Sequence, residues 1–173
     1  MKIATPDPAT LNDYYKTYLK YVRTDNLLVT LANQEKSTAA FLAGIDPDLE
    51  KFRYAENKWS IREIAGHLCD TERILSYRAL RFARRDETEL SGFDENDYIA
   101  NANYDEIPLH DIAAQLSSVR NSVTWLFRSF PEKVFDQKGV ANHTVVSVRD
   151  ILFFIIGHQE HHLGVIRDRY LSV

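Results

Sequence analysis

The sequence has little of what several protein classes require. It contains a single cysteine, so no disulfide forms within the chain and a reducing compartment is expected. Its 21 basic and 25 acidic residues give a formal net charge of −4, without the basic surface typical of nucleic-acid-binding proteins. No apolar run approaches the ~20 residues of a membrane span, and the N-terminus has no signal-peptide core. We therefore expect a soluble cytoplasmic protein that binds neither nucleic acid nor membrane.

Glycine and proline are also scarce, with 6 and 5 residues, and they lie between long segments rather than within them. This distribution favours helices joined by a few loops over a sheet with many turns. No strand pattern competes with that interpretation. The length of 173 residues fits one domain, residues 1–173, with a substantial core.

Four long helices are predicted from apolar periodicity and from start and stop signals, and the second and fourth begin with capping boxes, WSIRE and VSVRD. Their expected extents are about 11–43 with a break near residue 24, 60–85, 108–130, and from VSVRDI to 170. The acidic segment after the second helix is ~20 residues long, so it is expected to cross the bundle and cover a site. These features predict an all-α four-helix bundle with a long crossover between its second and third helices.

Histidines cluster near the C-terminus, where three of the six lie in GHQEHHLGVI, residues 157–166. Successive helical residues are ~100° apart, so His158 and His162 fall on one side, in line with the preceding apolar run ILFFII. Two histidines four residues apart on such a face can bind one cation. His161 lies ~60° to the side of His158 and is less suited to the same cation.

A pair of histidines also fits a helix whose core histidines are satisfied by hydrogen bonds, so a metal site needs a third ligand. His67, in EIAGHLCDTE, lies on an inward face of the second helix and reaches the level of the pair if the two helices run antiparallel. Cys69 points ~160° away from His67 and is expected to be a small buried hydrophobe. Gln159 stands where the HExxH motif has its glutamate base, which excludes that peptidase signature.

Charged side chains near the histidines are weaker candidates for a catalytic or binding role. Glu63 lies one turn before His67, although its capping-box role competes. Arg78 lies three turns beyond His67 on the same stripe, and Arg169 similarly follows His162. Either arginine could meet an anionic substrate group, or simply extend to water.

Other residues have plainer interpretations. Trp59 is expected to anchor the start of the second helix, with the mouth of a pocket as its alternative place. Glu72 and Glu160 are expected to be solvated or paired between helices. His110 and His143 are expected at the surface.

Two motifs together give the chain a family resemblance. WSIREIAGHLCDTE and GHQEHHLGVI resemble, in spacing and order, those of the DinB/YfiT-like superfamily of metal-dependent four-helix-bundle proteins, and the resemblance covers most of the chain. It implies three metal ligands at His67, His158 and His162, and a divalent transition metal, zinc or nickel. Members include transferases and isomerases that use a low-molecular-weight thiol, and hydrolases. Val165 departs from the pattern, since many relatives have glutamine there, which bears on substrate specificity.

Three neutral histidines leave a coordination position for water or substrate, as in catalytic rather than structural metal sites. We therefore expect a metal-dependent enzyme acting on a small molecule, either a thiol-dependent S-transferase or a hydrolase. A non-catalytic bundle that binds metal or ligand for sensing or stress response is the alternative, and a metal-free bundle with three core histidines is a third. The apolar stretch ILFFIIG indicates either a central helix or a homodimer interface.

Overall fold

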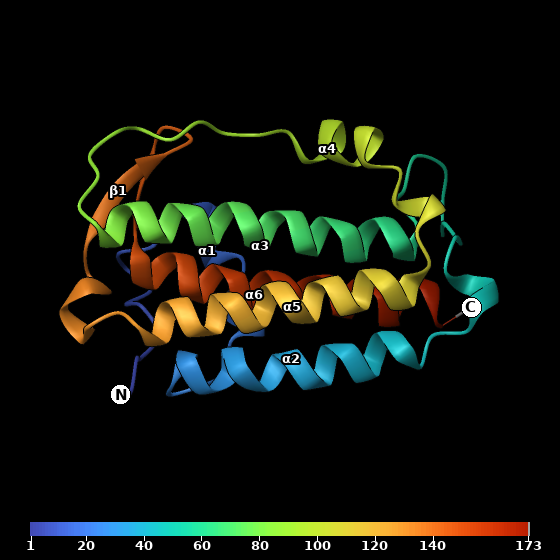
Figure 1. The fold of residues 1–173 in the computed structure, drawn as a ribbon, viewed down its shortest axis with the longest axis horizontal. Coiled ribbons are helices and arrows are strands. Elements are labelled where there is room, and N and C mark those ends of the chain that lie inside the picture. Colours follow the sequence, from blue (N-terminus) through green and yellow to red (C-terminus); the bar gives the residue numbers. More distant parts are fainter. Residues whose placement is uncertain (173) are drawn as a thin grey trace.

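Four long helices form the body of the protein, as a computed structural model that describes residues 1–172 shows (Figure 1). They are α2 (Leu27–Ala43), α3 (Ile61–Ala83), α5 (Leu109–Arg128) and α6 (Val148–Val165), and α6 continues into a π-helical turn, Ile166–Tyr170. Shorter elements are α1 (Asp13–Lys16), α4 (Glu95–Ala102), strands β1 (Lys138–Ala141) and β2 (Thr144–Ser147), and 3-10 turns at Leu19–Tyr21, Pro47–Leu49, Tyr104–Glu106 and Glu132–Val134. The predicted four-helix bundle is confirmed.

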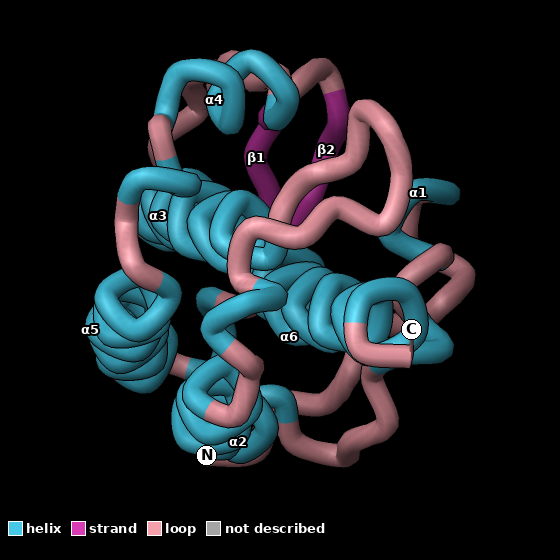
Figure 2. Tube along the Cα trace, turned by 90° about the vertical axis from the view of Figure 1, so that its right-hand side faces the viewer, coloured by secondary structure: helices cyan, strands magenta, loops and turns pink. Residues whose placement is uncertain are grey.

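The long crossover sets the directions of the helices. In Figure 1 the chain leaves the end of α3, runs back along that helix through α4, and enters α5, so α3 and α5 run parallel. Helix α6 runs antiparallel to α3. The end-on view in Figure 2 shows the four helices as a bundle in which α2 packs on α5 and α6, and α3 packs on α5 and α6. The antiparallel pairing of α3 and α6 is the arrangement that the histidine spacing required.

Both predicted capping boxes form. Ser60 accepts a hydrogen bond from the Glu63 amide while the Glu63 carboxylate accepts one from the Ser60 amide, and Ser147 and Asp150 repeat the pattern at α6. Each serine cap stabilises its helix by ~1 kcal/mol. These caps fix the starts of the two helices that carry the three selected histidines.

The N-terminal segment corrects the prediction of one long first helix. The break near residue 24 is present, but the residues before it form only α1 and a 3-10 turn. The Thr24 hydroxyl accepts a hydrogen bond from the Asn26 amide, and the Asn26 side chain caps α2. Such local side-chain bonds compete with a continuous helix. The freed segment packs along α6, where the Tyr15 and Tyr18 rings lie 4.6 and 4.7 Å from the Phe154 ring.

One short hairpin, which the sequence did not predict, accompanies the helices. Strands β1 and β2 form an antiparallel hairpin, and Asn142 and His143 at its turn have positive φ angles of 49° and 58°. Positive φ angles at both central residues are what a two-residue hairpin turn of type I′ requires. Leu90 from the crossover adds a parallel bridge to Ala141. The crossover is therefore pinned to the hairpin at one end and contains α4 at the other.

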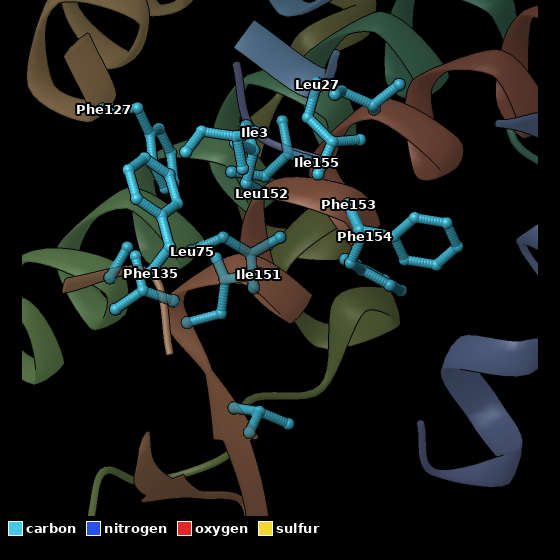
Figure 3. Close-up of a cluster of buried hydrophobic side chains, with 14 of the residues drawn as sticks. Ile3, Leu27, Leu75, Phe127, Phe135, Ile151, Leu152, Phe153, Phe154 and Ile155 are labelled. Carbon is cyan, nitrogen blue, oxygen red and sulfur yellow. The ribbon is translucent and has the colours of Figure 1, made fainter. Parts of the chain in front are cut away.

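The apolar first half of α6 is buried within the single chain. Residues from Ile151 to Ile156 are each at most 5% exposed, and Figure 3 shows several of them among side chains from other elements, including Leu27, Leu75 and Phe127. Of the two alternatives for this run, the central helix is therefore the one observed. The homodimer stays a prediction without support from this run. Among residues 1–172, no helix has the length and apolarity needed to cross a bilayer.

Apolar core residues fall into two clusters, one at each end of the bundle. The first surrounds the start of α6 and the end of α3, and the second surrounds the start of α3 and the end of α6. Between them lies a layer of buried polar side chains from all four helices, consisting of Gln34, Thr38, His67, Thr71, Glu72, Arg120, His158 and Gln159. The centre of the bundle is thus polar, which apolar patterning alone does not require.

Candidate metal centre

The three histidines selected from the sequence meet at mid-bundle. The Nε2 atom of His158 lies 3.1 Å from that of His67 and 3.1 Å from that of His162. The three potential ligand atoms lie within 4.8 Å of one another. Antiparallel packing of α3 and α6 produces this convergence, because it brings a histidine two turns into α3 beside a pair late in α6.

This geometry fits a divalent cation. Zinc–nitrogen bonds of ~2.0–2.1 Å in a tetrahedral arrangement separate two ligand nitrogens by ~3.3 Å. The two observed separations of 3.1 Å are close to that value. An ion placed among the three Nε2 atoms would have a trigonal set of nitrogen donors and at least one position left for another ligand.

Burial keeps these imidazoles in the form that binds metal. It lowers the pKa of His67 to about 4, and it lowers the pKa of His158 and of His162 well below the usual range, with the neighbouring histidines adding to the effect. A neutral imidazole offers a nitrogen lone pair, whereas a protonated one offers none. At neutral pH the cluster is therefore uncharged and available for ligation.

Aromatic and hydroxyl groups fix the orientation of the rings. The Trp59 ring lies 4.8 Å from the ring of His67, and the Phe154 ring is stacked at 5.2 Å on His158. The Thr71 hydroxyl lies 3.4 Å from Nδ1 of His67. Trp59 also packs against the second apolar cluster, so it both anchors the start of α3 and lines the site. Such contacts hold ligating imidazoles in place.

The histidines lie in the wall of an open cavity of about 570 Å³. Its other walls come from the N-terminal segment, the stretch before α4 and the β-hairpin. Tyr15, Tyr18 and Phe154 give it apolar surface, and Arg78 adds a cation. The volume is that of a small-molecule site.

A buried ion pair lies on the other side of His158. Arg120 is 1% exposed and donates to both carboxylate oxygens of Glu72, from Nε at 2.6 Å and from Nη2 at 2.8 Å. It also donates to the side-chain oxygens of Gln34 and Gln159, at 2.7 and 2.6 Å. Arg120 was not predicted as a central residue, although an arginine on the inward stripe of an amphipathic helix is a signal for such a position.

The interhelical pairing expected as one alternative for the two glutamates is found. Glu72 pairs with Arg120, and Glu160 accepts a hydrogen bond from the Gln34 side chain at 2.8 Å. Gln159 joins the same layer by donating to Thr38 at 2.5 Å. The residue that excluded the peptidase motif therefore has a structural role at the centre of the bundle.

The weaker candidates lie in different places. Glu63 completes the cap of α3 and pairs with Arg53 at 3.0 Å, outside the walls of the cavity. Arg78 lines the cavity and donates to the carbonyl of Ser91 at 2.7 Å. Arg169 is exposed and does not contribute to the cavity wall.

The remaining predicted positions follow their expected environments. Cys69 is fully buried, and burial raises the pKa of its thiol to about 12. His110 and His143 have side chains 79% and 91% exposed. His161 lies outside the cluster of three and places its Nδ1 3.0 Å from the Tyr21 hydroxyl, although it lines the same cavity.

Comparison with known proteins agrees with this architecture. The solved structure of YfiT from Bacillus subtilis, described as "a probable metal-dependent hydrolase with an unusual four-helix bundle topology", is similar, with a TM-score of 0.77. The comparison covers 98% of this chain and 93% of that one at 13% sequence identity, so it shows the fold. No curated protein matches the sequence. The family described as the DinB superfamily matches residues 30–166, and the chain therefore belongs to the DinB superfamily.

Proposed function

We propose that this protein is a metal-dependent hydrolase of a small molecule, with His67, His158 and His162 as the metal ligands. The observation that carries the proposal is the convergence of three neutral imidazole Nε2 atoms at the wall of a cavity of about 570 Å³. The description of YfiT as a probable metal-dependent hydrolase supports the reaction class.

The chain's own residues would bind the cation and position the substrate beside it. A bound divalent cation supplies Lewis-acid chemistry, polarising a substrate oxygen and making water more acidic. Trp59 and Phe154 restrict the two imidazoles that they contact to one orientation. Tyr15 and Tyr18 provide apolar walls for the part of the substrate that does not react. Imidazole donors suit zinc and nickel, and we propose one of these two as the native metal.

Metal analysis of the purified protein tests the first half of the proposal. We expect about one equivalent of divalent metal per chain, and loss of that metal in His162→Ala. His143→Ala, which alters an exposed histidine, is the matched control and should retain it. Substoichiometric metal in the wild type after growth with zinc and nickel, or retention of metal by His162→Ala, would refute the site.

A panel of ester and amide substrates tests the second half. Hydrolysis should disappear on chelation, return with the metal, and be lost in His162→Ala but not in His143→Ala. A metal-loaded protein that hydrolyses nothing in such a panel would favour the non-catalytic alternative, a bundle that binds metal or ligand for sensing or stress response.

A thiol-dependent S-transferase is the second candidate, because the cavity has room for more than one small molecule beside the histidines. A divalent metal stabilises a thiolate, the nucleophilic form of a low-molecular-weight thiol. If the protein is an S-transferase, it should transfer common thiols to model electrophiles only when the metal and His162 are present, and it should hydrolyse no esters. That pair of results would replace the hydrolase proposal.

A further inference from the structure

The cavity extends well beyond the histidines, along one face of α3. His67 and Arg78 both line it and lie 11 residues apart on this helix. At 1.5 Å per residue their backbone positions are ~16 Å apart along the helix axis. Leu75, between them, also lines the cavity, so the two ends belong to one continuous space. A substrate that reacts at the histidines has room to reach Arg78.

Arg78 has no counter-ion among residues 1–172. Its Nη2 donates to the carbonyl of Ser91, and its guanidinium lies 5.8 Å from the centre of the Phe93 ring. Glu95 lines the same cavity but forms no ion pair with it. An arginine side chain has five N–H donors, so most of those of Arg78 have no protein acceptor. Partial burial lowers the pKa of this guanidinium, which is the electrostatic cost of a cation held without a partner.

A tyrosine adds a second polar group at this end. Tyr15 lines the cavity with its ring stacked on Phe154, and its hydroxyl forms no hydrogen bond within residues 1–172. Tyr15 and Arg78 line the same cavity, so an anion bound there could meet a hydroxyl donor as well as the guanidinium. Between Arg78 and the histidines, Leu75 and Phe154 provide apolar surface, and Thr71 adds a hydroxyl next to His67.

We propose that Arg78 is a specificity-determining residue that binds a terminal oxyanion, a carboxylate or a phosphate, on an elongated substrate whose other end reacts at the three histidines. The planar fork of arginine suits both oxyanions. This inference deepens the proposed function and rests on it for the position of the reacting end. It predicts an amphiphilic substrate with an apolar middle and one anionic terminus.

Matched probes that differ only at that terminus test the inference. The metal-loaded protein is titrated with ω-mercaptoalkanoic acids of increasing chain length, with ω-mercaptoalkylphosphonates, and with ω-mercaptoalcohols of equal length. The thiol serves as a ligand for the metal in all three series. Binding is measured by calorimetry, which requires no turnover. At the best-fitting length an anionic probe should bind about tenfold or more tightly than the alcohol.

Variants assign that preference to one side chain. Arg78→Met should remove it while the alcohol keeps its affinity, and Arg78→Lys should retain part of it because the charge remains. Arg73→Met is the matched control, since Arg73 lies on the same helix outside the cavity and its removal changes the net charge equally. The alcohol series is also a control for the lost hydrogen bond to the Ser91 carbonyl, because loosening the segment around Ser91 would lower the affinity of both the anionic and the neutral probes.

Several outcomes would overturn the inference. They are equal affinity for anionic and neutral probes at every length, a preference that survives Arg78→Met, and failure of all the probes to bind metal-loaded protein. Comparison of the carboxylate and phosphonate series identifies which oxyanion is preferred. If the protein binds no metal, the proposed function fails. The inference is then tested by titrating the protein with sulfur-free alkanoic acids, whose binding must still depend on Arg78. If anionic probes bind more tightly but the protein hydrolyses no substrate, only the proposed hydrolysis is rejected and the role of Arg78 stands.

Discussion

Arg120→Met tests the source of stability at the centre of the bundle. The substitution removes four hydrogen bonds from a side chain that is 1% exposed, two of them to Glu72 and one each to Gln34 and Gln159. Glu72 stays buried and loses its counter-ion. Removing one partner of a buried ion pair costs ~3–5 kcal/mol, and each glutamine oxygen left without its donor adds ~1 kcal/mol. Because such terms are not additive, we expect a loss of ~4–6 kcal/mol in unfolding free energy.

The pH dependence of this loss should identify Glu72 as its source. Burial raises the pKa of Glu72, and Arg120 opposes that rise. Without Arg120 only burial acts, so the folded variant takes up a proton on Glu72 at a higher pH than the unfolded chain does. Protonation then favours the folded variant as pH falls. The difference in stability between wild type and variant should therefore narrow from pH 7 towards pH 5.

Urea unfolding at pH 7 in the presence of a chelator measures the effect without a contribution from metal binding. For a chain of this size a loss of ~1 kcal/mol in unfolding free energy lowers the melting temperature by ~2–4 °C. Thermal unfolding should therefore show a melting temperature ~10–20 °C lower in Arg120→Met than in the wild type. Glu72→Met and the double variant complete a double-mutant cycle, in which the double variant should lose much less than the sum of the singles. Arg73→Met, at an exposed pair, should stay within ~0.5 kcal/mol of wild type. A loss below ~1 kcal/mol in Arg120→Met, or single-variant losses that add up to that of the double variant, would exclude the Glu72–Arg120 pair as the source of this stability.

Three further predictions concern packing, protonation and metal binding. An alanine Cβ at Gly157 would lie 2.9 Å from Cβ of Tyr18, whereas a Cβ at Gly164 in the same helix would have no neighbour within 4 Å. Thermal unfolding should therefore show that Gly157→Ala is destabilised by ~1–3 kcal/mol and that Gly164→Ala is stabilised by up to ~1 kcal/mol. In metal-free protein, protonation of His67 alone should lower the unfolding free energy by ~3 kcal/mol between pH 6.5 and pH 4, because this imidazole takes up its proton near 6.5 in the unfolded chain and only near 4 in the folded one. Urea titrations at a series of pH values measure this fall, which should be smaller in the control variant His67→Gln. The substitution Trp125→Phe leaves Trp59 as the single tryptophan. In this background the tryptophan fluorescence should change when zinc or nickel is added, and it should stay constant when His162→Ala is also present. An equal change in the His162→Ala variant would contradict metal binding beside the Trp59 ring.

Local sequence signals were sufficient to predict α3, α5 and α6 and to select the three histidines, because both depend on local chemistry. Capping boxes at Ser60 and Ser147 are signals contained within four residues, and they fixed the starts of α3 and α6. The spacing of His158 and His162 placed both on one face by helical geometry alone. His67 could be added because its helix shows an inward stripe, and antiparallel packing was the one condition that the spacing imposed.

Tertiary structure decided how the site is enclosed and what supports it. The N-terminal segment has apolar residues at helical spacing, yet side-chain bonds of Thr24 and Asn26 make α2 begin at Leu27. The residues before it pack separately, and Tyr15 lines the cavity. The hairpin depends on two positive φ angles and on pairing with the crossover, which no short window of sequence reveals. The Glu72–Arg120 pair joins residues 48 positions apart, and its burial follows only from the packing of four helices around it. Contacts between distant residues require the whole chain to be folded. For this reason the three histidines that converge could be selected from the sequence, while the walls of the cavity and the central polar layer could not.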